Sequence, residues 1–292
     1  MTKYIKLLFF ISMITGFVSC ENANQENKLM ITVSVLPQKY FVEQIAGDLL
    51  EVNVMIPPGA SPATYEPTPK QIQDLTKSAL YLRIGYIEFE KGWMDRFEAV
   101  NTNMTVVNTA ADVDLIAADR HVHGDHVHLA GIDPHVWTSP KTVLTLIEST
   151  YTELQKLLPE NQEVIKKNYL VLKKNIEQLD QQIELQFKEL NGKSFFIYHP
   201  ALGYLARDYG FKQIAIEFEG KEPSPAHMKK LVDQAKAENI RVIFIQSQFN
   251  SENARAIANE IGASIISLDP LSEDWYNNTL KMTEEMARAM KL

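Results

Sequence analysis

The segment that decides the fold runs from Pro159 to Leu190 and has the sequence PENQEVIKKNYLVLKKNIEQLDQQIELQFKEL. Its apolar residues recur at intervals of three and four, which places them on one face of an α-helix: Ile165, Tyr169, Leu172, Ile176, Leu179, Ile183, Phe187 and Leu190. A helix of about thirty residues is roughly 45 Å long. A coiled-coil segment is the alternative. Because strands and helices alternate again directly after it, the pattern favours a helix lying along a globular body.

Strands and helices alternate on both sides of this segment. The predicted strands are 29–36, 51–56, 80–84, 104–108, 194–198, 212–217, 242–246 and 264–268. The predicted helices between and after them are 37–47, 69–77, 90–100, 140–158, 201–209, 225–238, 252–261 and 275–290. Such alternation is typical of largely parallel sheets covered by helices. The sequence therefore predicts an α/β protein with two doubly wound βα lobes, 29–158 and 193–292, joined by one long rigid helix over 159–192.

The start of the chain has the features of a lipoprotein signal. Lys3 and Lys6 precede an apolar run, 7–18, that is too short to span a bilayer but suits a signal peptide. Ser19-Cys20 follows, and Cys20 is the single cysteine of the chain. An ordinary secretory signal with an incidental cysteine is the alternative. We expect a signal peptide over 1–19, a lipid on Cys20, a polar tether over 20–28, and an extracytoplasmic protein anchored to a bacterial membrane, in the periplasm or at the cell surface.

The charge and the cysteine content of the chain exclude several classes of partner and of site. Loss of 1–19 lowers the formal net charge from −8 to −10, because Lys3 and Lys6 leave with it. An acidic chain without a basic block argues against nucleic acid as a partner. A single thiol allows no internal disulfide and excludes a zinc site built on several cysteines.

Histidines gather in the middle of the chain. Five of the seven lie within fifteen positions: His121, His123, His126, His128 and His135. Neutral imidazole is the commonest protein ligand for zinc and its neighbours, and His-rich tracts indicate metal binding. A tag or a solvated loop is the alternative. The position within the chain, the intervening Val and Asp residues and the D-P-H-V-W sequence that follows argue against a tag.

Further metal-ligand types follow the predicted strands. Open α/β sheets bind ligands at the carboxyl ends of their strands. His199 follows the strand 194–198, Asp269 follows 264–268, and His135 ends the His-rich tract. His199 or Asp269 could instead cap a helix or turn, and His135 beside Trp137 could be a packed histidine. Together the three residues predict a metal site between the lobes, with ligands that suit Zn2+ and also Mn2+ or Fe2+.

Several segments also match one known family in their order along the chain. They are PPGASPATYEPTP (57–69), DPHVWTSP (133–140), the long helix, YHPALGYLARDYG (198–210), EPSP (222–225) and LDPL (268–271). With these segments the chain resembles the metal-binding lipoproteins that serve bacterial zinc and manganese ABC importers as solute-binding components. The resemblance implies a monomer that is not an enzyme and that delivers a metal ion to a membrane permease. It implies His135, His199 and Asp269 as ligands, and a mobile auxiliary loop at 121–128.

Two positions depart from the family pattern. The family's first ligand is a histidine after proline, and this chain has Pro62-Ala63 there. Gln246 stands where many relatives have a glutamate. A histidine from 121–128, a water molecule or the carboxylate of Glu66 could complete the site in place of Ala63.

Two other functions compete with import. A three-ligand zinc site with an open position is how catalytic zinc is held, and Glu66 would be the candidate base of a secreted zinc-dependent hydrolase. The chain contains no H-E-x-x-H motif. The His-rich tract alone could serve a metal buffer or an adhesin. Zinc capture for an importer is the function that the sequence favours.

Overall fold

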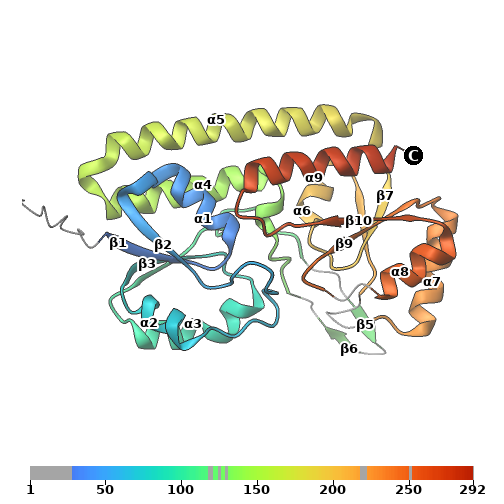
Figure 1. Ribbon diagram of the computed structural model, residues 1–292, viewed down its shortest axis with the longest axis horizontal. Coiled ribbons are helices and arrows are strands. Elements are labelled where there is room, and N and C mark those ends of the chain that lie inside the picture. The colour runs from blue at the N-terminus through green and yellow to red at the C-terminus, as the bar shows by residue number, and fades with distance from the viewer. Residues whose placement is uncertain are drawn as a thin grey trace, which may run out of the picture.

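The computed structural model describes residues 28–117, 121–123, 126–128, 131–217, 222–249 and 252–291, with the side chains of 121–128 left aside. Two four-stranded parallel sheets form the centres of two lobes (Figure 1). The first has the order β2-β1-β3-β4 and the second β10-β9-β7-β8. Their strands are β1 (Leu29–Val33), β2 (Leu50–Val54), β3 (Ser78–Arg83), β4 (Thr105–Asn108), β7 (Ser194–Ile197), β8 (Lys212–Ala215), β9 (Val242–Gln246) and β10 (Ser264–Leu268).

The two sheets share one topology. In each, the first strand in sequence pairs with the second, which is an edge strand, and also with the third, which in turn pairs with the fourth. The helices of the lobes are α1 (Leu36–Ala46), α2 (Pro69–Leu75), α3 (Glu88–Val100), α6 (Gly203–Tyr209), α7 (Pro225–Ala237), α8 (Glu252–Ile261) and α9 (Trp275–Met290). A 3-10 turn, Gly47–Leu49, follows α1. Because all strands of a sheet run parallel, their carboxyl ends meet at one edge in each lobe.

The long helix joins the lobes as predicted. Helix α5 (Gln162–Phe187) continues at both ends into 3-10 turns, Pro159–Asn161 and Lys188–Leu190, and α4 (Pro140–Leu157) precedes it. All eight residues of its apolar face are buried. Figure 1 shows α5 running along one side of both lobes. The fold predicted from the sequence, two parallel α/β lobes with one connecting helix, is confirmed.

Local boundaries differ from the predictions where side chains bind the backbone. Strand β1 ends at Val33 and not at Leu36, because the side-chain oxygen of Gln38 accepts the backbone N–H groups of Ser34 and Val35, at 3.0 and 3.2 Å. These bonds turn the chain into α1, with Pro37 in its first turn.

The His-rich tract was predicted as a loop, and its backbone instead forms a short hairpin. Strands β5 (His121–His123) and β6 (His126–His128) pair antiparallel, with His121 opposite His128. The physical reason is the sequence H-V-H-G-D-H-V-H, in which β-branched valines flank a Gly-Asp pair that favours a two-residue turn. The signal sequence and Cys20 lie outside the described residues. Within the part that is described, no helix is long and apolar enough to cross a bilayer.

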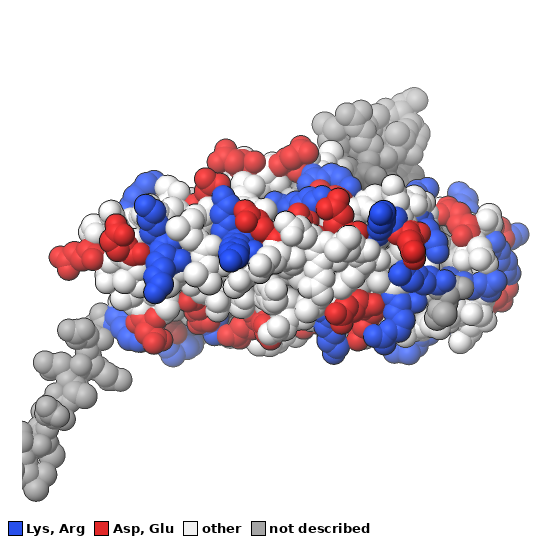
Figure 2. All heavy atoms as spheres, turned by 90° about the horizontal axis from the view of Figure 1, so that it is seen from above, with Lys and Arg blue, Asp and Glu red and all other residues white. Residues whose placement is uncertain are grey.

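The surface over the long helix carries mixed charges. Figure 2 shows this face, on which basic and acidic side chains alternate around a broad uncharged area. No continuous patch of one sign is visible on it.

Candidate metal centre

Two histidines from opposite lobes meet in this structure. His135 lies directly before a 3-10 turn, Val136–Thr138, and His199 lies two residues after β7. Their Nε2 atoms are 3.2 Å apart, and the rings are nearly perpendicular, with centroids 5.0 Å apart at 76°. Of the predicted ligands, these two are brought together.

A carboxylate lies behind each imidazole. Asp133 Oδ1 lies 2.7 Å from Nδ1 of His135 and also accepts the backbone N–H of His135 at 2.9 Å. Glu217 Oε1 lies 2.7 Å from Nδ1 of His199, and Glu217 is only 8% exposed. A carboxylate can only accept, so each Nδ1 carries the proton and each Nε2 is left with its lone pair. Both lone pairs then point into the same space.

This arrangement favours a cation between the rings. Two unprotonated nitrogens 3.2 Å apart repel each other unless a proton or a metal ion lies between them. Two nitrogens each about 2.05 Å from one zinc ion, at a tetrahedral angle of about 109°, lie about 3.3 Å apart. The observed separation therefore matches chelation of a single ion by both histidines.

Burial keeps His199 in the form that binds metal. Removal from water lowers the pKa of His199 below its ordinary value of 6.5, and the hydrogen bond that His199 donates to Glu217 offsets part of this effect by raising the pKa. The charged form of the neighbouring His135 lowers the pKa of His199 further. A neutral imidazole at pH 7 needs to lose no proton before it binds an ion.

The backbone of His199 is held by Gln246. The Gln246 side-chain oxygen accepts the backbone N–H of His199 at 3.2 Å, and the Gln246 side-chain N–H group donates to the His199 carbonyl at 2.7 Å. A glutamate could accept but not donate. The sequence showed only a lost negative charge at this position, whereas the structure shows a two-point clamp. The ring of Phe249 also stacks on His199, with centroids 4.4 Å apart.

Asp133 is fixed by contacts with helix α6. The hydroxyl of Tyr204 on α6 donates to the Asp133 carbonyl at 2.7 Å. Gly203 provides the space for the carboxylate, because a Cβ atom at Gly203 would lie 2.4 Å from Asp133 Oδ2. Helix α6 of the second lobe therefore supports the turn that carries His135.

Asp269 stands apart from the histidine pair. Its side chain is exposed, and Oδ1 accepts from Gln248 Nε2 at 3.0 Å and from the backbone N–H of Leu271 at 3.1 Å. Among the residues with described side chains, no group of three or more His, Cys, Asp or Glu residues is placed to hold a metal ion. The structure thus brings together His135 and His199 without a third ligand of these types.

The remaining candidates are placed as follows. Ala63 and Glu66 are both exposed in the turn after β2, where the backbone N–H of Ala63 donates to Ser61 Oγ at 3.3 Å. The side chains of His121, His123, His126 and His128, and the whole of Cys20, fall outside what the structure describes.

Sequence reasoning gave no role to Asp133 or Glu217. Asp133 appeared only as part of D-P-H-V-W, and Glu217 only as the last residue of the predicted strand 212–217. The signals that could have found them are an acid two residues before a candidate histidine and an acid just past β8, the strand that pairs with β7.

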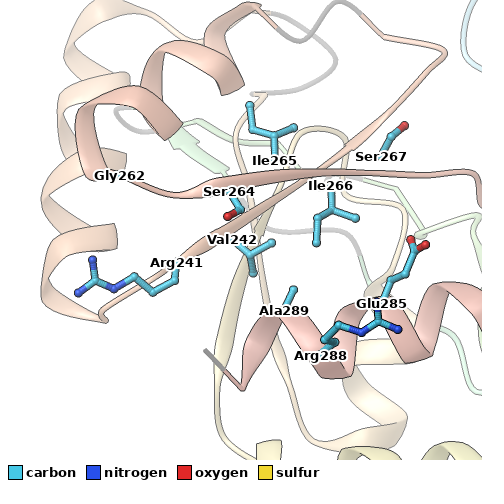
Figure 3. A pocket seen from close by; sticks show the side chains of 10 residues that line it. All are labelled: Arg241, Val242, Gly262, Ser264, Ile265, Ile266, Ser267, Glu285, Arg288 and Ala289. Carbon is cyan, nitrogen blue, oxygen red and sulfur yellow. The ribbon is translucent and has the colours of Figure 1, made fainter.

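A hollow in the second lobe is a different feature. It has a volume of about 640 Å³ and lies along the edge strand β10, beside the end of α9 (Figure 3). Its lining contains Arg241, Arg288 and Glu285 but no histidine or cysteine. Because one carboxylate and two guanidinium groups are a poor donor set for a metal, this hollow is not the metal centre.

The fold and the facing histidines point to one class: metal-binding proteins of two parallel α/β lobes. Residues 31–291 match the ZnuA family model, described as zinc-uptake complex component A, periplasmic, so the chain belongs to this family. This is a family of metal-binding transport receptors that work with ABC permeases, not a family of enzymes. The family predicted from the sequence is confirmed.

Three relatives illustrate the similarity. The high-affinity zinc uptake system protein ZnuA of Bacillus subtilis (strain 168) is 31% identical over 254 residues, which are 84% of this chain and 79% of that protein. The zinc-binding lipoprotein AdcA of Streptococcus pneumoniae serotype 4 is 28% identical, over 99% of this chain and 60% of its own length. A crystal structure of ZnuA is 36% identical, with a TM-score of 0.84 over 90% of this chain and 99% of that one.

Proposed function

We propose that this protein captures Zn2+ outside the cytoplasm with His135 and His199 and passes it to an ABC permease. The observation that carries this proposal is the pair of facing Nε2 atoms, 3.2 Å apart, each on a ring whose Nδ1 lies against a carboxylate. Nitrogen ligands favour zinc, and Mn2+ and Fe2+ are further ions that such a site accepts. The names of the B. subtilis and S. pneumoniae relatives support zinc.

Asp269 is the proposed third ligand. It follows β10 at the same carboxyl edge as His199, and its exposed carboxylate accepts hydrogen bonds from Gln248 and from the backbone of its own turn. A water molecule, a histidine from 121–128 or Glu66 takes the fourth position that Ala63 leaves without a ligand. With water in this position, the site keeps one place open for exchange, which suits a protein that must release its ion.

The attachment to the membrane is part of the same proposal. A lipid on Cys20 and a tether over 20–28 would hold a monomeric two-lobed domain near the permease. Nine extended residues reach roughly 30 Å, which is enough for the domain to turn towards a neighbouring membrane protein. The lipoprotein AdcA supports this arrangement by its name.

Calorimetric zinc titration tests the site. The protein from Cys20 onwards should bind one ion, and His135→Ala or His199→Ala should each weaken binding by more than about 100-fold, since loss of an outer-shell partner alone costs about 10- to 100-fold. His227→Ala, at the first turn of α7, is the matched histidine control and should bind like the wild type. Unchanged tight binding in both ligand variants would contradict the proposed site.

A further inference from the structure

Two buried tryptophans lie at the junction of the lobes, close in sequence to two of the proposed ligands. Trp137 is two residues after His135 and 1% exposed. Trp275 is the first residue of α9, six residues after Asp269, and is 2% exposed. Each indole has one N–H group that must find an acceptor when it is buried.

The two indole N–H groups tie the ligand-bearing turns to each other. Trp137 Nε1 donates to the carbonyl oxygen of Pro270 at 2.8 Å, and Pro270 directly follows Asp269. Trp275 Nε1 donates to the carbonyl oxygen of Trp137 at 2.7 Å. The turn that carries His135 and the turn that carries Asp269 are therefore joined by two buried hydrogen bonds.

The segment after β10 is also packed on the first lobe. The Trp275 ring lies edge-to-face on Phe41 of α1, with centroids 5.2 Å apart at 70°, and it also contacts Tyr40. Lys39 Nζ lies 2.5 Å from a carboxylate oxygen of Glu273. Figure 1 shows α9 beginning beside α1 and running out over the second lobe. Although 269–275 follows the last strand of the second lobe, it is fixed against the first.

His199 is held by a separate set of residues. Its contacts with Glu217, Gln246 and Phe249 all come from the second lobe. The turn that carries His135 has other contacts: Tyr204 of α6 supports it through the Asp133 carbonyl, and Trp137 joins it to the Asp269 turn.

We propose that Trp137 and Trp275 are positioning residues that hold the Asp269 turn in register with His135. The Asp269 turn then keeps a fixed position relative to His135. This inference rests on the proposed function, because it requires Asp269 to contribute to ion binding. The indoles touch no ion themselves and act through the position of the Asp269 turn.

A double-mutant cycle between Trp137 and Asp269 tests the inference. Trp137→Phe keeps an aromatic ring but removes the N–H donor to Pro270. Zinc affinity should fall on the order of tenfold in Trp137→Phe, as for other partners outside the ligand shell. In the Asp269→Ala background the same substitution should change affinity less than twofold, because the residue through which it acts is gone. Trp93→Phe, in α3 of the first lobe, is the matched tryptophan control and should have no effect.

The possible results separate the two proposals. A wild-type protein that binds no zinc overturns the proposed function. Tight wild-type binding that is lost in His135→Ala but unchanged in Asp269→Ala keeps the function and overturns the inference. An equal loss from Trp137→Phe in both backgrounds also overturns it, because the tryptophan then acts only on overall packing. If Trp137→Phe does not fold, Trp275→Phe, which removes the second hydrogen bond, takes its place in the same cycle with the same expected results.

Discussion

The carboxyl ends of the two sheets differ in chemistry although the two sheets share one topology. In the first lobe, β1 ends at Val33, and the hydroxyl of the next residue, Ser34, donates to the carboxylate of Glu90. In the second lobe, the equivalent strand β7 leads to His199, whose ring binds the carboxylate of Glu217. Each edge thus contains a buried carboxylate with a side-chain partner from the central strand.

The two carboxylates face different partners. Glu90 is 1% exposed and accepts hydrogen bonds from the backbone N–H groups of Ile84 at 2.8 Å and Gly85 at 2.5 Å. Its carboxylate therefore satisfies the buried backbone donors that follow β3. Glu217 instead binds a ring whose other nitrogen points out of the lobe. In the first lobe the proposed ligand, His135, lies in the segment after β4 and not at a strand end. The carboxylate of the first edge satisfies buried backbone donors, whereas that of the second edge orients a ring of the proposed site.

The largest expected effect is on the stability of the first lobe. Glu90→Ala would leave buried donors at Ile84, Gly85 and Ser34 without an acceptor, which should lower the free energy of unfolding by about 3 kcal/mol. Zinc affinity should change less than about twofold, because Glu90 touches neither histidine. Urea unfolding and zinc titration measure the two quantities. Glu88→Ala, at an exposed ion pair in the same helix, is the control and should cost less than about 0.5 kcal/mol. A large loss of affinity in a stable Glu90→Ala protein would remove the contrast between the edges.

The next largest effect is expected on zinc affinity, from substitution of the buried carboxylate of the second lobe. Glu217→Ala removes the group that fixes the tautomer and orientation of His199, and zinc affinity should fall about 10- to 100-fold. Glu217→Gln, which can still accept from Nδ1, should lose less. Titration calorimetry at pH 7.5 measures the change, and Glu222→Ala, an exposed acid in the same loop, is the control. Wild-type affinity in Glu217→Ala would show that the carboxylate is only a packing partner.

The sequence predicted the elements of both lobes because each depends on local patterns. The apolar face of 159–190 and the β-branched runs survive in the structure nearly residue for residue. The methionines 282, 286 and 290, which recur every four residues in the predicted helix 275–290, are buried. That His135 and His199 lie close together was predicted from the position of His199 after a strand and from the family resemblance.

What could not be predicted depends on contacts between distant segments. The clamp of Gln246 on His199 spans 47 positions, and the bond from Trp137 to Pro270 spans 133. Neither residue type carries a local signal for such a partner. The difference between Glu90 and Glu217 is likewise invisible in sequence, because both are acids near a strand end. Their roles follow from what lies within hydrogen-bond distance after the chain has folded.

The contributions of Glu90 and His199 to the stability of the folded protein should change with pH in opposite directions. Burial raises the pKa of Glu90 above its ordinary 4.5, so the folded protein keeps this proton to higher pH than the unfolded chain. The stability that Glu90 contributes is therefore lost as pH rises through the raised pKa. Burial lowers the pKa of His199 below 6.5, so its contribution is present above 6.5 and is lost as pH falls through the lowered pKa.

Urea unfolding of the metal-free protein between pH 4.5 and 8 measures both signs. The wild type should lose stability relative to Glu90→Gln as pH rises, and it should gain stability relative to His199→Gln over the same range. Slopes of the same sign in the two comparisons would mean that burial does not dominate at one of the edges.

The smallest effect is expected from the His-rich hairpin, because its stem is held independently of it. Ala117 pairs with Ile132, the backbone N–H of Asp133 donates to the Ile116 carbonyl at 3.0 Å, and Tyr204 fixes both sides of this stem through its hydroxyl. Replacing 119–130 by two glycines should therefore leave Asp133 and His135 in place, and zinc should still bind one-to-one with an affinity changed less than about threefold, or about 0.6 kcal/mol. Calorimetry on this variant separates the remaining ways to complete the site. A tenfold or greater loss of zinc affinity would assign the open position at Ala63 to a histidine of 121–128. Retention of the tight site would assign that position to water or to Glu66. Glu66→Gln in the shortened protein then distinguishes these two, because it weakens binding only if Glu66 is the ligand.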